Sequence, residues 1–149
     1  MNKHLKGASP SRRLKFSRDE PYFLNVDLEI TSTSKLDTVI AEMSTRVVVL
    51  YSGPAAGKKK HLLVLESSRQ HGGPDTTIHA LCSVIEALSP AARRILNAAQ
   101  KEFDVGYELR ASERSSRFTL RPDTLERVAR LGAALAVSYY RGRCDDDTK

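Results

Sequence analysis

The first regular pattern in the chain lies between positions 22 and 30, where polar and apolar residues alternate from Asn25 to Ile30. Its apolar positions include Val26, Leu28 and Ile30, and its polar positions include Asn25, Asp27 and Glu29. Because successive side chains of a β-strand point to opposite faces of the sheet, this segment is predicted to be a strand with one buried face. Residues 102–109 alternate in the same way, with Phe103 and Tyr107 on the buried side.

Other segments predict further strands and helices. Runs rich in β-branched and apolar residues predict strands over residues 46–51, 61–67, 117–120 and 134–140. Apolar residues at spacings of three and four predict helices over about 34–43, 75–88, 91–100 and 123–131. N-terminal caps are expected from Ser34, Asp75, Ser89 and Asp123.

Strands and helices interleave in this reading, yet several strands follow one another directly. That order favours an α+β fold with a mostly antiparallel six-stranded sheet and helices on one face. Its first half matches split β-α-β units of the ferredoxin-like kind. Residues 35–51 and 124–140 resemble each other as helix–strand units, which suggests a possible internal duplication.

Charge divides the chain into unequal parts. Residues 1–18 contain six of the 24 Lys and Arg and no acidic residue, so the remaining 18 balance the 18 Asp and Glu. Such a segment cannot bury enough apolar surface to order itself. We therefore predict a basic disordered arm over residues 1–19, one domain over 20–141 and a charged tail over 142–149.

Cysteine content and hydropathy restrict the protein class. The two cysteines, Cys82 and Cys144, form no disulfide framework, so a reduced, cytoplasmic setting is expected. No apolar run approaches the roughly 18 residues that a membrane-spanning helix needs. A membrane partner is therefore not expected.

The loop Ser52-Gly-Pro-Ala-Ala-Gly-Lys-Lys-Lys60 resembles a phosphate-binding loop at first sight. A functional loop requires the spacing G-x-x-x-x-G-K-[ST] followed by a helix whose N-terminus faces the phosphate. Here the glycines are one residue too close, Lys59 replaces the hydroxyl residue and a strand follows. A hairpin turn is predicted instead, with Lys58, Lys59 and Lys60 as a basic patch for an acidic partner or a nucleic-acid backbone.

Two groups of residues could carry chemistry. His79 and Cys82 lie three residues apart with His71 nearby, but zinc normally requires four ligands, so core packing is the preferred interpretation. Acidic residues share the polar face of the two alternating strands, namely Asp27, Glu29, Asp104 and Glu108. An acidic sheet face could bind a divalent metal or supply an acid and a base, and the alternative is a solvated sheet face. We predict no catalytic residue, no resident metal and no cofactor.

Nucleic-acid binding has limited support in the sequence. Aromatic residues make up 6% of the chain and Trp is absent, which disfavours base stacking on an open sheet. The arm could still bind phosphates through Arg12, Arg13 and Lys15, and the alternative is a solvated tail.

The last third of the chain contains Phe103-Asp-Val-Gly106 and, after a short strand, Thr124-Leu-Glu-Arg-Val-Ala-Arg-Leu-Gly132. In both motifs it resembles a bacterial family of unknown function with an F-D-[IV]-G strand, some of whose members are similar to immunity proteins against polymorphic toxins. The resemblance implies structural roles for Phe103 in the core and for Gly106 in a close approach. It implies no catalytic residue.

These observations lead to one functional hypothesis and two alternatives. We expect a non-catalytic protein-binding module, an immunity-type or regulatory partner of another bacterial protein such as a toxin or a regulator. The first alternative is a nucleic-acid-associated protein that uses the basic arm and the lysine loop. The second is a metal-dependent hydrolase that uses the acidic sheet face. The sequence leaves the oligomeric state open.

Overall fold

The computed structural model describes residues 22–57, 59–109 and 117–141. Along the chain, the elements are β1 (Tyr22–Ser32), α1 (Asp37–Met43), β2 (Val47–Pro54), β3 (His61–Ser67), α2 (Pro74–Glu86), α3 (Pro90–Ala98), β4 (Gln100–Leu109), α4 (Pro122–Arg130) and β5 (Ala134–Arg141). The predicted basic arm, residues 1–19, and the predicted charged tail, residues 142–149, lie outside the described residues.

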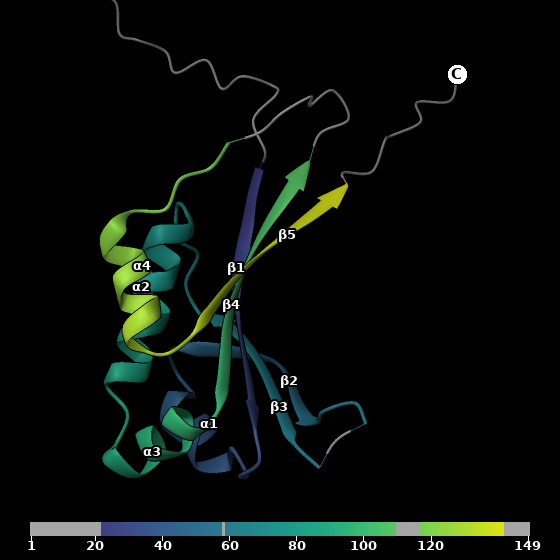
Figure 1. Ribbon diagram of the computed structural model, residues 1–149, viewed down its shortest axis with the longest axis vertical. Coiled ribbons are helices and arrows are strands. Elements are labelled where there is room, and N and C mark those ends of the chain that lie inside the picture. Colours follow the sequence, from purple (N-terminus) through teal and green to yellow (C-terminus); the bar gives the residue numbers. More distant parts are fainter. Residues whose placement is uncertain (1–21, 58, 110–116, 142–149) are drawn as a thin grey trace, which may run out of the picture.

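The described strands form one mixed sheet of five strands in the order β2-β3-β1-β4-β5. The central strand β1 is antiparallel to both β3 and β4, and β2 forms an antiparallel hairpin with β3. The last strand, β5, runs parallel to β4, because α4 carries the chain back between them. All four described helices lie against one face of the sheet and leave the other face open (Figure 1).

The α+β class is confirmed, but the expected sixth strand is wrong. Residues 117–120 have no strand pairing. Their apolar side chains, Phe118 and Leu120, pack against the core instead, and the ring of Phe118 lies 5.1 Å from that of Tyr107. The expectation of a mostly antiparallel sheet holds for three of the four pairings among the described strands, the parallel β4–β5 pair being the exception.

Alternation along β1 and β4 creates the core. Val26, Leu28 and Ile30 of β1 are at most 1% exposed, and Phe103 and Val105 of β4 are fully buried beside them. Buried side chains from α2, such as those at positions 78, 81 and 85, complete this layer. Each large apolar side chain of this kind contributes roughly 1.5–3 kcal/mol when it is withdrawn from water.

The helix ends follow the sequence only in part. Ser89 caps α3 as expected, because its hydroxyl accepts a hydrogen bond from the N–H of Ala92. The same hydroxyl donates to Glu42 of α1, and this bond joins the two helices. The expected caps at Ser34, Asp75 and Asp123 are wrong, since no side chain caps α1, α2 or α4.

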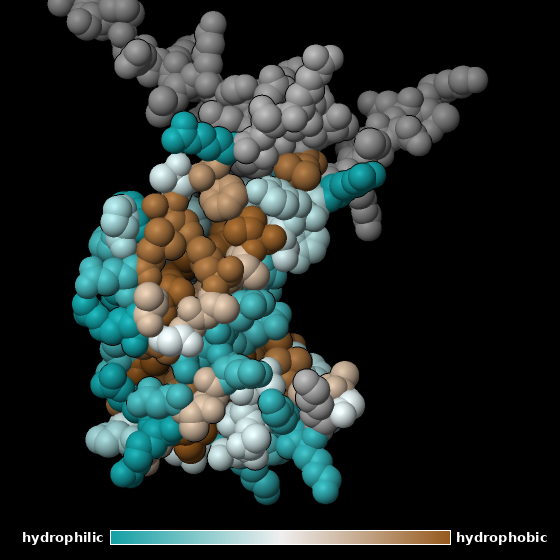
Figure 2. All heavy atoms as spheres, viewed as in Figure 1, coloured by the Kyte–Doolittle hydropathy of each residue, from teal (hydrophilic) through white to brown (hydrophobic). Residues whose placement is uncertain are grey.

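Both outer strands expose apolar side chains. On β2, four consecutive residues from Val48 to Tyr51 are between 39% and 49% exposed. Apolar side chains also gather along α4 and the first half of β5 in Figure 2, where Leu131, Leu135 and Val137 are only partly buried. Within the described residues, none of the helices has the length and apolar character that crossing a membrane demands.

Candidate functional site

The open face of the sheet carries a cluster of carboxylates on its three inner strands. The side chains opposite the core positions of β1, β3 and β4 point away from the helices, because alternate residues of a strand face opposite ways. Six of them are acidic and partly buried. We call the five that lie in two adjacent rows the acidic face: Asp27, Glu29, Glu66, Glu102 and Asp104.

Strand register places these residues in two rows across the sheet. Asp27 is paired with Glu66 of β3 on one side and with Asp104 of β4 on the other. In the next row, Glu29 is paired with Glu102. Directly opposed residues on one face have Cβ atoms about 4.5–5.5 Å apart, so like charges in such pairs repel each other.

Two polar neighbours hold the carboxylates in place. The side-chain amide of Asn25 donates to Oδ1 of Asp27 over 2.8 Å, and the hydroxyl of Ser138 donates to Oδ2 of Asp104 over 2.8 Å. The other carboxylate oxygen of Asp104, Oδ1, is buried and has no hydrogen-bond partner among the described residues. The face therefore contains an acceptor that lacks a donor.

No described cation compensates this charge. The ion pairs found among the described residues all involve side chains of α2 or α4 or the residue before α4. Lys101 lies on β4 but points to the other side of the sheet, where its ammonium donates to the carbonyls of Leu96 and Ala99. Burial raises the pKa of Asp27 above its usual range, and the neighbouring charges of Glu66, Asp104 and Glu29 raise it further.

The structure brings together three of the four acidic residues predicted from the sequence. Asp27, Glu29 and Asp104 lie within the acidic face, whereas Glu108 is paired with Tyr22 near the opposite end of β4. The sequence analysis missed Glu66 and Glu102. Glu102 is the first residue of the alternating segment 102–109 and shares a face with Asp104, so the sequence contained the signal for it. Only the pairing of β3 with β1 identifies Glu66.

The two residues of the F-D-[IV]-G motif with expected structural roles are also placed. Phe103 is fully buried. Gly106 lies on the open face, where a Cβ atom would come within 2.8 Å of Oδ1 of Asn25. Glycine at this position therefore leaves room for the amide that holds Asp27.

The lysine loop connects β2 to β3 as a hairpin turn. Gly57 has a φ of 70°, the left-handed conformation that favours glycine. Lys59 is exposed and Lys60 is partly buried, while Lys58, Arg12, Arg13 and Lys15 lie outside the described residues. A strand follows the turn, so this part of the chain has no helix N-terminus that could face a phosphate.

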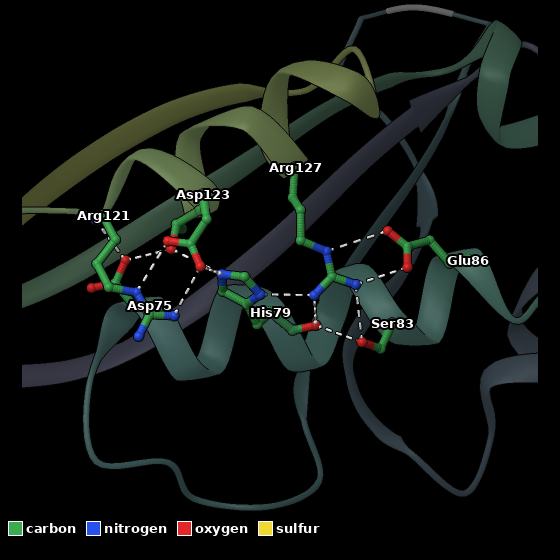
Figure 3. A network of polar contacts seen from close by, with 8 residues as sticks. Asp75, His79, Ser83, Glu86, Arg121, Asp123 and Arg127 are labelled. Carbon is green, nitrogen blue, oxygen red and sulfur yellow. Dashed lines mark hydrogen bonds and ion pairs between the residues drawn. The ribbon is translucent and has the colours of Figure 1, made fainter.

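A second polar network joins α2 to α4 (Figure 3). Nη1 of Arg127 lies 2.8 Å from Nδ1 of His79, and Nε2 of His79 lies 3.1 Å from the hydroxyl of Thr124. That hydroxyl donates to Asp75 over 2.5 Å, and the backbone N–H of Arg121 donates to the same oxygen. Arg127 also forms an ion pair with Glu86 at 2.8 Å.

This network resembles a nucleophile–base–acid array, but its hydrogen bonds point the wrong way for catalysis. A guanidinium can only donate, so Nδ1 of His79 must be the acceptor, and Nε2 must carry the proton. His79 therefore donates to Thr124 and cannot take its proton in this arrangement. Thr124 is also fully buried, and the network holds α4 onto α2.

The residues considered for zinc do not converge. Cys82 is fully buried in the core, and burial raises the pKa of its thiol to about 11. His71 bonds to the hydroxyl of Ser67, and His79 belongs to the α2–α4 network. Within the described ranges, no group of three or more His, Cys, Asp or Glu side chains is arranged to hold a metal ion.

Comparison with known proteins identifies no relative. No protein-family model, curated protein sequence or solved structure matches this chain.

Proposed function

We propose that the protein is a non-catalytic protein-binding module, an immunity-type or regulatory partner of another bacterial protein. The acidic face is its binding surface, and the partner presents a basic patch. The module acts by contact, covering a surface or an active site of the partner.

The position of Asp27 between Glu66 and Asp104 carries this proposal. Three carboxylates in one row without a described cation oppose folding, because each is partly withdrawn from water beside like charges. Lys and Arg side chains of a partner would offset this repulsion and would also supply the donor that Oδ1 of Asp104 lacks. Charge complementarity of this kind also accelerates association and selects against acidic partners.

The absence of a poised catalytic group in the described network supports a binding role over a hydrolytic one. His79 is committed as a donor to Thr124, and Thr124 has no access to solvent. Metal-dependent hydrolysis at the acidic face would require a metal held by those carboxylates, and no group of three or more described His, Cys, Asp or Glu side chains is arranged to hold one.

Two finer relationships belong to the same proposal. The order β4-β1-β3-β2 agrees with a ferredoxin-like split β-α-β arrangement, to which β5 adds a parallel strand. The units α1–β2 and α4–β5 occupy opposite edges of the sheet, as an internal duplication would place them. We propose both relationships, together with membership of the F-D-[IV]-G family.

Affinity capture from native host cells tests the function, with the full chain as bait and mass spectrometry as readout. The wild type is compared with D27N/D104N and with the matched control D37N/E126Q, which removes two exposed carboxylates from α1 and α4. We expect one stoichiometric protein with a basic surface, captured by the wild type and the control and lost with D27N/D104N. Capture of nucleic acid alone, equal capture by all three baits, or no stoichiometric partner would each overturn the proposal.

A further inference from the structure

The strand β2 forms one edge of the described sheet and pairs only with β3 there (Figure 1). The backbone N–H and C=O groups on its outer side therefore have no strand partner among the described residues. Such an edge is a template for pairing with a further strand. We propose that β2 pairs in antiparallel fashion with β2 of a second copy of this chain, so that two sheets join across a two-fold axis.

Apolar side chains on both faces of β2 favour an added strand. Four consecutive residues, Val48 to Tyr51, are between 39% and 49% exposed. Their pairing with β3 places Val48 and Tyr51 on the open face and Val49 on the face that carries the helices. A second strand beside β2 would withdraw part of this apolar surface from water on both faces. On the opposite edge strand, β5, the large hydrophobic side chains of comparable exposure are the two tyrosines near its end.

Tyr51 is held against β2 before any partner binds. Its hydroxyl donates to the carbonyl of Pro54 over 2.9 Å. The same hydroxyl lies beside Gly53, where a Cβ atom would come within 2.8 Å of its oxygen. A side chain that is already ordered loses little conformational freedom on association. The ring therefore presents a fixed apolar surface to the second copy.

The charge pattern of this edge favours a second copy as the partner. Pairing about a two-fold axis places residues near the axis opposite themselves or their neighbours, so any charge there would repel its own copy. Residues 47–57 contain no charged side chain. The strand thus lacks the charges by which many edge strands prevent self-pairing, and also those that would select a strand of different sequence. A shift in register between Val49 and Tyr51 adds twist without adding charge.

The size of the edge sets the strength of the dimer. The eight residues of β2 extend about 26 Å, and a sheet layer is about 10 Å thick, so two paired edges bury roughly 500 Å² in total. Stable complexes bury about 1,200–2,000 Å². Main-chain hydrogen bonds supply much of the affinity when a strand is added to a sheet. We therefore expect a reversible dimer with a dissociation constant in the micromolar to millimolar range.

The direction of pairing determines how the two copies are arranged. For antiparallel strands of one sheet, the two-fold axis is normal to the sheet, so both copies keep the same face on the same side. The described helices of both copies would lie on one side of the joined sheet, and both acidic faces on the other. The dimer rests on β2 and not on the proposed function, which it would extend to two binding surfaces on one particle.

Sedimentation equilibrium of the full chain, from about 10 µM to about 1 mM, tests the dimer. The wild type is compared with L50K and with the matched control L125K, in which the same charge replaces a leucine of α4; Leu50 is 49% and Leu125 46% exposed. We expect a dissociation constant at least about tenfold higher in L50K and unchanged in L125K, because a charge on the edge opposes its own copy. A wild type that stays monomeric throughout, or an equal effect in L125K, would overturn the proposal.

Cysteine crosslinking tests the same contact without adding a charge. Residues opposed at the axis have Cα atoms about 4.5–5.5 Å apart, which a disulfide can bridge. A residue two positions from the axis lies more than about 13 Å from its copy. The cysteines are placed one at a time at positions 48, 49, 50 and 51 of a Cys144→Ser chain, whose remaining Cys82 is buried.

We expect disulfide-linked dimers at one position or at two adjacent positions, and none with Leu125→Cys. Crosslinking at none of the four positions, or equal crosslinking at all of them and at position 125, would overturn the proposal. Growth into polymers instead of dimers would also overturn it, because head-to-tail pairing of β2 with β5 of the next copy does not close.

The effect of salt separates this contact from an ionic one. Arg46 precedes β2, and Lys59 and Lys60 follow it, so antiparallel pairing brings positive charges of the two copies toward each other. Screening at about 0.5 M salt weakens that repulsion. The dissociation constant should therefore stay constant or fall as salt is added, and a rise would overturn the proposal.

The outcomes distinguish this dimer from the proposed function. Failure of the capture experiment, with the expected dimer, would refute the proposed function alone. A monomeric wild type that captures a partner which L50K loses would assign β2 to a different protein and refute the dimer alone.

Discussion

Asp27 of β1 lies directly opposite Asp104 of β4, on the face of the sheet that no described helix covers. Each carboxylate has one neutral side-chain donor, Asn25 for Asp27 and Ser138 for Asp104. Neutral donors orient a carboxylate but do not cancel its charge. The pair is therefore held in place while its repulsion persists, an arrangement suited to a surface that meets a basic partner.

Replacing Asp27 with Asn is expected to stabilise the fold at neutral pH. The amide is similar in shape, can accept the hydrogen bond from Asn25, and removes the repulsion by Glu66 and Asp104. Relief of such cross-strand repulsion should raise the free energy of unfolding by about 0.2–1 kcal/mol. Urea unfolding at pH 7 measures this difference.

The same substitution has a defined pH dependence. Because folding raises the pKa of Asp27, the folded protein binds this proton more tightly than the unfolded chain. The charge of Asp27 does not destabilise the fold below pH 3.8, the ordinary pKa of an aspartate, because the group is then protonated in both states. The destabilisation develops as the pH rises through the raised pKa of Asp27 in the folded protein. The difference in free energy of unfolding between D27N and the wild type should therefore disappear on acidification. A difference that is constant with pH would contradict this cause. Asp37→Asn should not stabilise, because Asp37 favours the first turn of α1.

The fold was largely predictable where apolar periodicity was strong. The alternation around Val26 and Phe103 identified the two central strands, because burial on one face leaves a period of two in the sequence. Residues 117–120 were misassigned, because two apolar residues packing on a core look like a short strand. The parallel direction of β5 depends on the path of α4 across the sheet, and local periodicity does not encode it.

Thr124→Val should weaken the attachment of α4 to α2. Valine has the same shape but cannot accept from Nε2 of His79 or donate to Asp75. Leaving a buried donor without a partner costs about 1–3 kcal/mol, so the free energy of unfolding should fall by that amount. Thr124→Ser keeps the hydroxyl and is the control. An unchanged free energy of unfolding in Thr124→Val, measured in urea, would show that these two hydrogen bonds do not stabilise the fold.

Cys82 should resist alkylation in the folded protein. Its thiol is buried, and burial raises its pKa to about 11, so the reactive thiolate is scarce near pH 8. A Cys144→Ser chain retains Cys82 as its single thiol. Iodoacetamide labelling followed by mass spectrometry should be slow in buffer and fast in urea; rapid labelling of the native chain would show that the thiol is accessible.

Gly106→Ala should disturb the acidic face through Asn25. A Cβ atom at position 106 would approach Oδ1 of Asn25 to 2.8 Å and displace the amide that donates to Asp27. We expect a loss of about 0.5–1.5 kcal/mol in the free energy of unfolding, the usual contribution of one hydrogen bond. The double variant N25A/G106A should lose less than the sum of the single changes, as in a double-mutant cycle. Additive losses would show that the contact is unimportant.

The candidate site was harder to predict from the sequence than the fold was. Asp27, Glu29 and Asp104 followed from alternation, since residues two apart on a strand share a face. Glu66 required the order of the strands, which places β3 beside β1. The α2–α4 network was missed because Asp75 and Thr124 are 49 residues apart and give no local signal.

The affinity of the captured partner for this protein tests the central claim most directly. Titration calorimetry gives the dissociation constant for the wild type, for D27N/D104N and for D37N/E126Q. If the acidic face binds a basic patch, D27N/D104N should weaken binding at least about tenfold, or 1.4 kcal/mol, and the control should bind as the wild type does. Equal dissociation constants for all three proteins would contradict the claim.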